Sequence, residues 1–216
     1  MTTGPTTEDL EALATGWNPD PARSMSLSAD AYTDPRWFDV EVDAVFSRTW
    51  QWVCHVEKVR DPGAYTTTTI AGRSVAVVRD GESLRAFSNV CMHRAHELLT
   101  GEGSLRRITC PYHAWSYGLD GGLRTAPHTD HLIDFDPESI CLDAVSVEEF
   151  GGFVYVNLDP EAPALADQAG DLAAEIAHWA PDVADLTHAH RLTYEIASDW
   201  KNVIDNFLEC YHCPVA

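Results

Sequence analysis

The chain has 216 residues and is acidic: 14 Lys and Arg residues stand against 34 Asp and Glu residues, for a formal net charge of −20. This length can bury a substantial core in one large or two small domains, and the charge argues against anionic partners such as nucleic acids or membrane surfaces. Six cysteines are too few for a disulfide scaffold. Residues 1–29 lack the basic start and apolar stretch of a signal peptide, and no apolar run is long enough to span a membrane. A cytoplasmic location is predicted.

The first half of the chain is predicted to contain a leader, a helix and an antiparallel β domain. The leader extends to about Leu27, and the helix begins at Asp34-Pro35, an N-cap residue followed by proline at N1. Asp80-Gly81 is a turn signal between two apolar runs and predicts a hairpin. Alternating or β-branched residues predict strands over residues 50–55, 64–70, 75–78 and 84–87.

Two short clusters of potential metal ligands follow this hairpin. Cys91-Met92-His93 and Cys110-Pro111-Tyr112-His113 are separated by sixteen residues, Arg94 to Thr109. Each cluster offers one thiolate and one imidazole, and the spacing fits two loops that project side by side from a β scaffold. Two Cys and two His ligands are those of a Rieske [2Fe–2S] centre, in which neutral imidazoles replace two anionic thiolates and raise the reduction potential.

A structural zinc site is the alternative, since zinc also binds Cys and His. Zinc modules usually pair Cys with Cys and His with His, at spacings of two or more residues. A single residue separates Cys91 from His93, which suits a two-iron cluster better. Pro111 stiffens the second loop, and Tyr112 and Trp115 are placed to shield a centre from water. The iron–sulfur interpretation is therefore favoured.

Further elements are predicted beyond the ligand loops. Residues 152–158 are rich in Phe, Val and Tyr and predict another strand of the β domain. Residues 165–180 carry an apolar stripe at helical spacing, which is interpreted as ordinary core. Residues 188–196 are predicted as a strand.

The segment Asp199–His212 is predicted to form an amphipathic helix. Its polar side carries two carboxylates, two carboxamides and an imidazole, a composition unusual for a merely solvated face. Glu209 and His212 are three residues apart and therefore neighbours on the helix. A carboxylate beside an imidazole is the usual arrangement that orients a metal-bound histidine, and non-heme Fe(II) sites use histidine ligands of this kind. A solvated polar face is the alternative.

The chain resembles the large (α) subunits of Rieske-type ring-hydroxylating and N-demethylating oxygenases. The resemblance begins near Ser26 and rests on four motifs in the family's order: CMHRAH, CPYHAWSYGLDGGL, FGGFVYVNLDP and DWKNVIDNFLECYHC. It implies an α+β fold. A leader and N-terminal helix (1–45) would precede a small antiparallel β Rieske domain (46–160) and the beginning of an α+β, helix-grip-like catalytic domain (161–216).

The resemblance also implies roles for the C-terminal helix. His212 matches the first histidine ligand of a mononuclear Fe(II), and Glu209 matches a carboxylate that links this iron to the Rieske histidine of a neighbouring subunit. Asp205 and Asn206 match the acidic–Asn pair of the same helix. The family's second histidine would fall at position 217 and its third ligand farther on, so the chain is expected to be a truncated fragment that is inactive alone.

Cofactors and partners follow from the same resemblance. The family holds a [2Fe–2S] cluster, here through Cys91, His93, Cys110 and His113, and a mononuclear Fe(II). Electrons come from NAD(P)H through a separate flavin and iron–sulfur reductase, or through a ferredoxin. The chain has no Gly-rich dinucleotide motif of its own, which agrees with an external reductase. A homotrimer is expected for the full-length protein.

Substrate class is predicted from one residue. Glu209 stands in ECYHC where aromatic-ring dioxygenases usually carry Asp, which favours quaternary or N-methylated amines such as carnitine, betaines or choline. An aromatic-ring dioxygenase is the alternative, and a stand-alone Rieske electron carrier is an alternative from another class. Two glycines common in the ligand loops are replaced by Ala95 and Ala114, changes that are not expected to disturb ligation.

The remaining Cys and His residues are interpreted as structural. Cys54-His55 and Cys141 are expected in the core, and Cys210 and Cys213 are expected to line a pocket. Arg94 is interpreted either as a contact for a redox partner or as a solvated residue. Four histidines are expected at the surface: His128, His131, His188 and His190.

Overall fold

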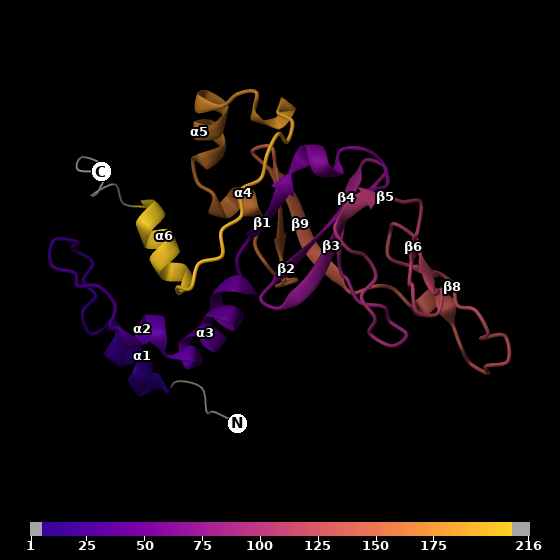
Figure 1. Cartoon of the computed structure of the whole chain (residues 1–216), viewed down its shortest axis with the longest axis horizontal. Coiled ribbons are helices and arrows are strands. Elements are labelled where there is room, and N and C mark those ends of the chain that lie inside the picture. Colours follow the sequence, from indigo (N-terminus) through magenta and orange to yellow (C-terminus); the bar gives the residue numbers. More distant parts are fainter. Residues whose placement is uncertain (1–5, 209–216) are drawn as a thin grey trace. The chain divides into compact units, whose positions relative to one another are not determined.

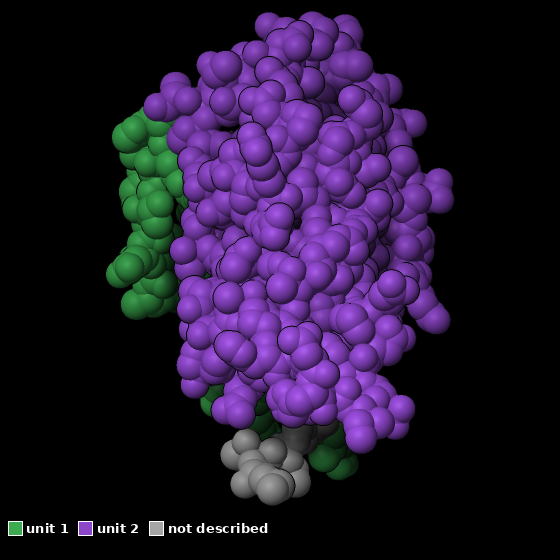
Figure 2. All heavy atoms as spheres, turned by 90° about the vertical axis from the view of Figure 1, so that its right-hand side faces the viewer, with its two compact units in different colours: residues 1–45, 190–216 green, residues 46–189 purple. Residues whose placement is uncertain are grey.

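The structure is a computed structural model that describes residues 6–208. The chain forms two compact units, coloured separately in Figure 2. Unit 1 comprises residues 1–45 and 190–216, and unit 2 comprises residues 46–189. The units are defined by compactness, so the predicted domain limits at residues 45 and 160 stay predictions.

Unit 2 is built on a seven-stranded antiparallel sheet with the strand order β1-β10-β9-β4-β3-β2-β5 (Figure 1). A single tight turn joins β3 to β4, with Gly81 at a φ of 60°. The strands are β1 (Gln51–His55), β2 (Ala64–Ile70), β3 (Arg73–Asp80), β4 (Ser83–Ser88), β5 (Glu102–Ser104), β9 (Ala144–Phe150) and β10 (Phe153–Asn157).

A second, three-stranded sheet lies at one end of unit 2 (Figure 1). It consists of β6 (Ile108–Thr109), β7 (Ser116–Tyr117) and β8 (Leu123–Thr125), all antiparallel. The second ligand loop connects β6 to β7. The first ligand loop follows β4 and returns toward β5. Both candidate loops therefore belong to the end of unit 2 that carries the small sheet.

Two hydrophobic clusters hold unit 2 together. One lies within the large sheet and includes Val59, Val77 and Val154, each fully buried. The other joins the two sheets and contains Cys91, Cys110, Trp115 and Tyr117 together with Phe87, Ile108, Leu123 and Leu142. The thiols of the candidate centre are thus part of a packed core, which fixes the stems of both loops.

The predicted strands of unit 2 are confirmed. Residues 64–70 coincide with β2, and the other predicted runs fall within or around β1, β3, β4 and β10. The sequence pattern missed β5, β6, β7 and β8, which have only two or three residues each. It also missed β9, whose residues alternate in burial only weakly.

Unit 1 contains four helices among its described residues: α1 (Thr7–Ala14), α2 (Asp30–Thr33), α3 (Pro35–Glu41) and α6 (Trp200–Leu208). Asp34 caps α3 and accepts a hydrogen bond from Arg36 N, as predicted. The leader predicted up to about Leu27 contains a helix that the sequence pattern did not indicate, α1. Thr6 and Asp9 make a reciprocal capping box that stabilises its first turn.

Two predictions for the later part of the chain are wrong. Residues 165–180 are helical, as their spacing predicted, but they form two short helices, α4 (Leu165–Gln168) and α5 (Leu172–Trp179), separated by Gly170 at a φ of 53°. Their apolar stripe is not core, since no residue of either helix is buried. Residues 188–196 form no strand: their side chains are exposed and no neighbouring strand within residues 6–208 pairs with them.

Short irregular helices complete the described chain: the π-helix η1 (Val42–Phe46) and the 3-10 helices η2 (Val56–Val59), η3 (Pro137–Ser139) and η4 (Val183–Asp185). No helix within residues 6–208 has both the length and the apolar character needed to cross a membrane.

Candidate metal centre

The two ligand loops adopt the same turn. Cys91 N donates to His96 O at 2.9 Å, and Ala95 N donates to Cys91 O at 2.9 Å. The second loop repeats this pattern: Cys110 N donates to Trp115 O at 2.8 Å, and Ala114 N donates to Cys110 O at 3.0 Å. Each loop therefore presents its cysteine at the start of a closed turn, with its histidine two or three residues later.

Both turns place an alanine in the left-handed region. The φ angles are 53° at Ala95 and 59° at Ala114, where a side chain is strained. An alanine in this region costs about 1–2 kcal/mol, and the greater freedom of glycine in the unfolded chain costs about 0.4–1 kcal/mol. The alanines are therefore tolerated in the loops but are not optimal there.

Ala95→Gly is expected to raise the free energy of unfolding of the metal-free chain by about 0.5 kcal/mol, because relief of strain exceeds the entropic cost. Denaturant titration would measure this. Ala144→Gly is the control: Ala144 lies at the exposed start of β9 with an ordinary φ, so its replacement should destabilise the chain. Equal destabilisation by both changes would contradict the strain at Ala95.

The thiols of the site are buried and its imidazoles are exposed. Cys91 and Cys110 are 2 % and 3 % exposed, whereas His93 and His113 are at the surface. The two imidazole rings meet edge to face, with centroids 4.8 Å apart. Trp115 stacks on the ring of His93 at 4.8 Å and an interplanar angle of 7°. The donor set is thus divided into an inner thiol pair and an outer imidazole pair.

Tyr117 lies against the inner pair and is completely buried. Its hydroxyl accepts a hydrogen bond from Met92 N at 3.1 Å and lies 3.2 Å from Cys91 Sγ. Because the hydroxyl already accepts from Met92, its own proton is free to point toward the sulfur. Burial raises the pKa of Tyr117, and the hydrogen bond and charge of Cys91 raise it further. The phenol therefore stays protonated and remains a donor.

Burial and nearby charges favour the neutral form of His113. Desolvation, followed by the positive charges of His93 and Arg94, lowers the pKa of His113. Neutral imidazole is the form that binds a metal. Tyr112 covers one side of this ring at a centroid distance of 3.8 Å, although it is itself 55 % exposed.

No three His, Cys, Asp or Glu side chains within residues 6–208 converge as a single metal ion would require. The chemistry of the donor set fits a [2Fe–2S] group, which takes two sulfur and two nitrogen ligands from two loops. The residues that could hold such a group are Cys91, His93, Cys110 and His113.

Comparison with known proteins places these loops in a family. Residues 49–137 match the Rieske [2Fe-2S] domain, and residues 183–216 match the catalytic domain of the ring-hydroxylating alpha subunit. The chain belongs to the Rieske oxygenase α-subunit family. The prediction of the family, and that of an α+β fold with an antiparallel β Rieske domain, are confirmed.

Several known proteins are similar to this α subunit over most of its length. The carnitine monooxygenase oxygenase subunit of Escherichia coli (strain K12) is 42% identical over 199 residues, covering 91% of this chain and 53% of the relative. The chloroplastic choline monooxygenase of Beta vulgaris is 33% identical over 223 residues, covering 100% and 50%. The crystal structure of the quaternary ammonium Rieske monooxygenase CntA with L-carnitine superposes with a TM-score of 0.82 at 40% identity, covering 86% and 53%. The chain spans about half the length of the curated relatives that it matches.

The α6 helix of this Rieske α subunit carries the other predicted site residues. Asp205 and Asn206 are exposed on α6, and Asp205 accepts from Tyr32 OH at 3.5 Å. Glu209 and His212 lie outside the described residues, as do Cys210 and Cys213. The geometry of the predicted mononuclear iron ligand is therefore not described.

A half-buried ion network fixes the start of α6 within unit 1. Glu41, at the end of α3, accepts from Lys201 Nζ at 2.5 Å and from Trp200 Nε1 at 2.6 Å. Lys201 also pairs with Asp199 at 2.9 Å. Burial acts to lower the pKa of Lys201, but the hydrogen bonds to Asp199 and Glu41 outweigh it, so the pKa is raised. Lys201 therefore stays charged and ties α6 to α3.

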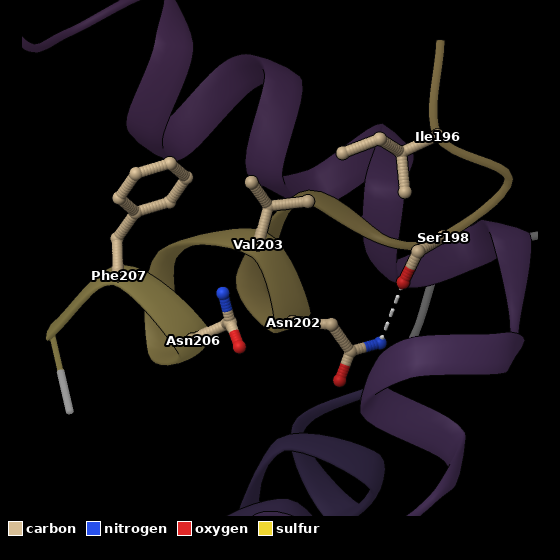
Figure 3. A pocket seen from close by; sticks show the side chains of 6 residues that line it. All are labelled: Ile196, Ser198, Asn202, Val203, Asn206 and Phe207. Carbon is tan, nitrogen blue, oxygen red and sulfur yellow. Dashed lines mark hydrogen bonds between the residues drawn. The ribbon is translucent and has the colours of Figure 1, made fainter. Parts of the chain in front are cut away.

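Beyond this network, α6 borders an apolar pocket of about 240 Å³ (Figure 3). Asn202 Nδ2 donates to Ser198 Oγ at 3.1 Å along its wall. Phe207 stands at its rim and is 79 % exposed. The lining residues are Ile196, Ser198, Asn202, Val203, Asn206 and Phe207.

The other Cys and His residues divide between correct and wrong predictions. Cys54 is buried as predicted, and burial raises its pKa to about 12. The prediction that Cys141 is buried is wrong: it follows η3 in a loop and is exposed. All four histidines expected at the surface are exposed: His128, His131, His188 and His190.

Local sequence patterns did not indicate three residues that shape the site: Tyr117, Asn89 and Glu41. Tyr117 follows His113 by four residues, and its alternation with Ser116 gave only a weak strand signal. Asn89 precedes the first ligand by two residues but carries no pattern of its own. Glu41 accepts hydrogen bonds from Trp200 and Lys201, which follow it by 159 and 160 positions in the sequence. No local pattern predicts contacts over such a separation.

Proposed function

We propose that the chain forms part of the oxygenase component of a multicomponent Rieske oxygenase. Electrons from NAD(P)H would pass through a separate reductase to a [2Fe–2S] cluster and then to a mononuclear Fe(II) that activates O₂. The observation that carries this proposal is the pair of identical turns that bring Cys91, His93, Cys110 and His113 together.

The [2Fe–2S] group supplies one-electron transfer at a potential raised by its histidine ligands. Cys91 and Cys110 would bind it from the inner side, where burial excludes water from the sulfur atoms. His93 and His113 would bind it from the outer side and present a path to the surface. The stacked ring of Trp115 and the hydroxyl of Tyr117 would orient these ligands.

The mononuclear site is proposed from the resemblance of residues 199–213 to the family's iron-ligand helix. His212 would bind the Fe(II), and Glu209 would link it to a Rieske histidine of a neighbouring subunit in a trimer. Asp205 and Asn206 would complete the polar face of α6. The half-buried ion pair of Glu41 and Lys201 supports this role, because it holds the start of that helix in place.

We propose a quaternary or N-methylated amine as the substrate, hydroxylated or oxidatively demethylated. Two observations support this class. The relatives include a carnitine monooxygenase oxygenase subunit and a choline monooxygenase, which are named for such amines, and Glu209 stands where the aromatic-ring enzymes usually carry Asp. A flavin and iron–sulfur reductase, or a ferredoxin, would be the electron donor.

Metal and sulfide analysis with a visible spectrum tests the proposal. Anaerobic reconstitution is expected to give a red-brown chain with about two irons and two labile sulfides, the content of one Rieske cluster. A colourless chain with one zinc would overturn it. With a complete catalytic domain and a reductase, O₂ uptake that depends on a quaternary amine is expected; a cluster without such uptake would indicate a stand-alone electron carrier.

Tyr117→Phe is expected to lower the reduction potential of the cluster. A hydrogen bond to a ligand sulfur stabilises the more negative, reduced state. A difference of about 1 kcal/mol corresponds to roughly 40 mV for a one-electron couple. Protein-film voltammetry would measure the shift, with Tyr155→Phe, at a half-buried position in β10, as the control. An unchanged potential would show that the Tyr117 proton does not point toward Cys91.

A further inference from the structure

We infer that Asn89 is a positioning residue for the cluster. Its side-chain amide sets the conformation of the first ligand loop and thereby the positions of Cys91 and His93. This inference rests on the proposed function, because it assigns the amide a role toward the [2Fe–2S] group. The partners of the Asn89 amide are Ser74, Glu97 and Leu99, none of which is a proposed ligand.

The two ligand loops have the same turn but differently built bases. The second loop closes on a regular ladder, in which Ile108 pairs with Tyr117 and Thr109 with Ser116. The first loop closes only on an isolated bridge between Val90 and Glu97. A turn with so little backbone pairing needs other hydrogen bonds to hold one conformation.

Asn89 supplies these hydrogen bonds from its side chain. Its Oδ1 accepts from Leu99 N at 2.9 Å, and its Nδ2 donates to Leu99 O at 2.7 Å. The amide thus pairs with Leu99 as the backbone of a neighbouring strand would. The backbone carbonyl of Asn89 accepts from Leu98 N at 3.1 Å, on the same side of the loop. The residue is fully buried, so water does not compete for these bonds.

The same amide connects the loop to the large sheet. Asn89 Nδ2 donates to Ser74 Oγ at 3.0 Å, and Asn89 N donates to Ser74 O at 2.9 Å. Ser74 Oγ also donates to Glu97 Oε1 at 2.8 Å, at the far stem of the loop. Ser74 is part of β3, so both stems of the first loop are fixed to one strand.

Only a side chain that carries both a donor and an acceptor can pair with Leu99 N and Leu99 O at the same time. Asn89→Ala removes both hydrogen-bonding groups and leaves Leu99 N and O unpaired. Asn89→Asp keeps the shape but places a carboxylate oxygen against Leu99 O, where two acceptors repel each other. Both changes are expected to loosen the first loop and leave the second loop, with its own ladder, intact.

The rate of cluster loss tests the inference on the reconstituted chain. Bleaching of the visible absorbance in the presence of an iron chelator gives this rate, and the EPR spectrum of the reduced cluster reports on its ligands. Asn89→Ala and Asn89→Asp are each expected to accelerate bleaching about tenfold, from the loss of two buried hydrogen bonds, and to alter the EPR spectrum. Ser74→Ala removes the two hydrogen bonds of Ser74 Oγ, to Asn89 Nδ2 and Glu97 Oε1, but keeps the backbone bond from Asn89 N to Ser74 O. It is expected to accelerate bleaching severalfold.

Asn157→Ala is the matched control. Asn157 is equally buried in unit 2, where Nδ2 donates to Arg48 O at 3.2 Å and Oδ1 accepts from Asp159 N at 3.0 Å. It should lower thermal stability as Asn89→Ala does, but leave the bleaching rate and the EPR spectrum at wild-type values. Wild-type bleaching in Asn89→Ala, or equal acceleration in Asn157→Ala, would overturn the inference. If Asn89→Ala does not fold, wild-type bleaching in Ser74→Ala overturns it. A wild-type chain that takes up no cluster would instead overturn the proposed function.

Discussion

Replacing His93 or His113 by cysteine is expected to lower the reduction potential of the cluster by on the order of 100 mV or more, since all-cysteine clusters of plant type lie far below Rieske centres. A thiolate adds a negative charge to the cluster and so stabilises its oxidised state. The exposed positions of His93 and His113 allow a cysteine side chain without repacking the core. Protein-film voltammetry of the reconstituted chain would measure the shift.

His96→Cys is the control for this prediction. His96 lies in the first loop and is also exposed, but its ring contacts Tyr112 at 5.5 Å and it is not a proposed ligand. Its replacement should leave the potential unchanged. A fall in potential in His96→Cys, or none in His93→Cys and His113→Cys, would contradict the ligand assignment.

The second large effect concerns the proposed mononuclear site, in an oxygenase with its complete catalytic domain. His212→Ala is expected to abolish turnover while the visible spectrum of the Rieske cluster stays intact, because the two metals have separate ligands. Glu209→Gln is expected to keep trimer, cluster and iron content but to slow electron transfer between the metals at least about tenfold, within the range seen for residues that support metal ligands.

Single-turnover oxidation of the reduced cluster, with substrate and O₂ present, measures this transfer. Glu195→Gln is the control, since Glu195 is an exposed carboxylate that precedes α6. Loss of the cluster spectrum in His212→Ala would instead make that residue part of the folding core. A wild-type rate of cluster oxidation in Glu209→Gln would contradict the bridging role and favour the alternative that Glu209 is a solvated residue.

Local patterns predicted the large sheet well, for a physical reason. Strands β2, β3 and β4 are long enough to show alternation or β-branched runs, and Asp80-Gly81 marks the turn between two of them. The strands of the small sheet have only two or three residues, too few to show such runs. Packing in the hydrophobic cluster, which includes Ile108, Tyr117 and Leu123, stabilises them instead. The predicted strand at 188–196 failed for the opposite reason. Its apolar residues have no partner in the described chain, and Tyr194 is 75 % exposed.

The candidate ligands could be predicted because their chemistry lies in short spacings. What orients them could not. Tyr117 reaches Cys91 across 26 positions, and Asn89 binds Ser74 across 15. Ala95 and Ala114 were expected to be harmless replacements for glycine, yet only the structure shows that both occupy the left-handed region. Contacts of this kind are made by tertiary folding and leave no periodic trace.

Pulsed EPR of the reduced, reconstituted chain with isotopically labelled histidine most directly tests the assignment of Cys91, His93, Cys110 and His113 as Rieske ligands. Two sets of histidine nitrogen couplings are expected. One of them should disappear in His93→Cys and the other in His113→Cys. A reduced cluster without histidine coupling, or couplings that survive both replacements, would contradict the assignment.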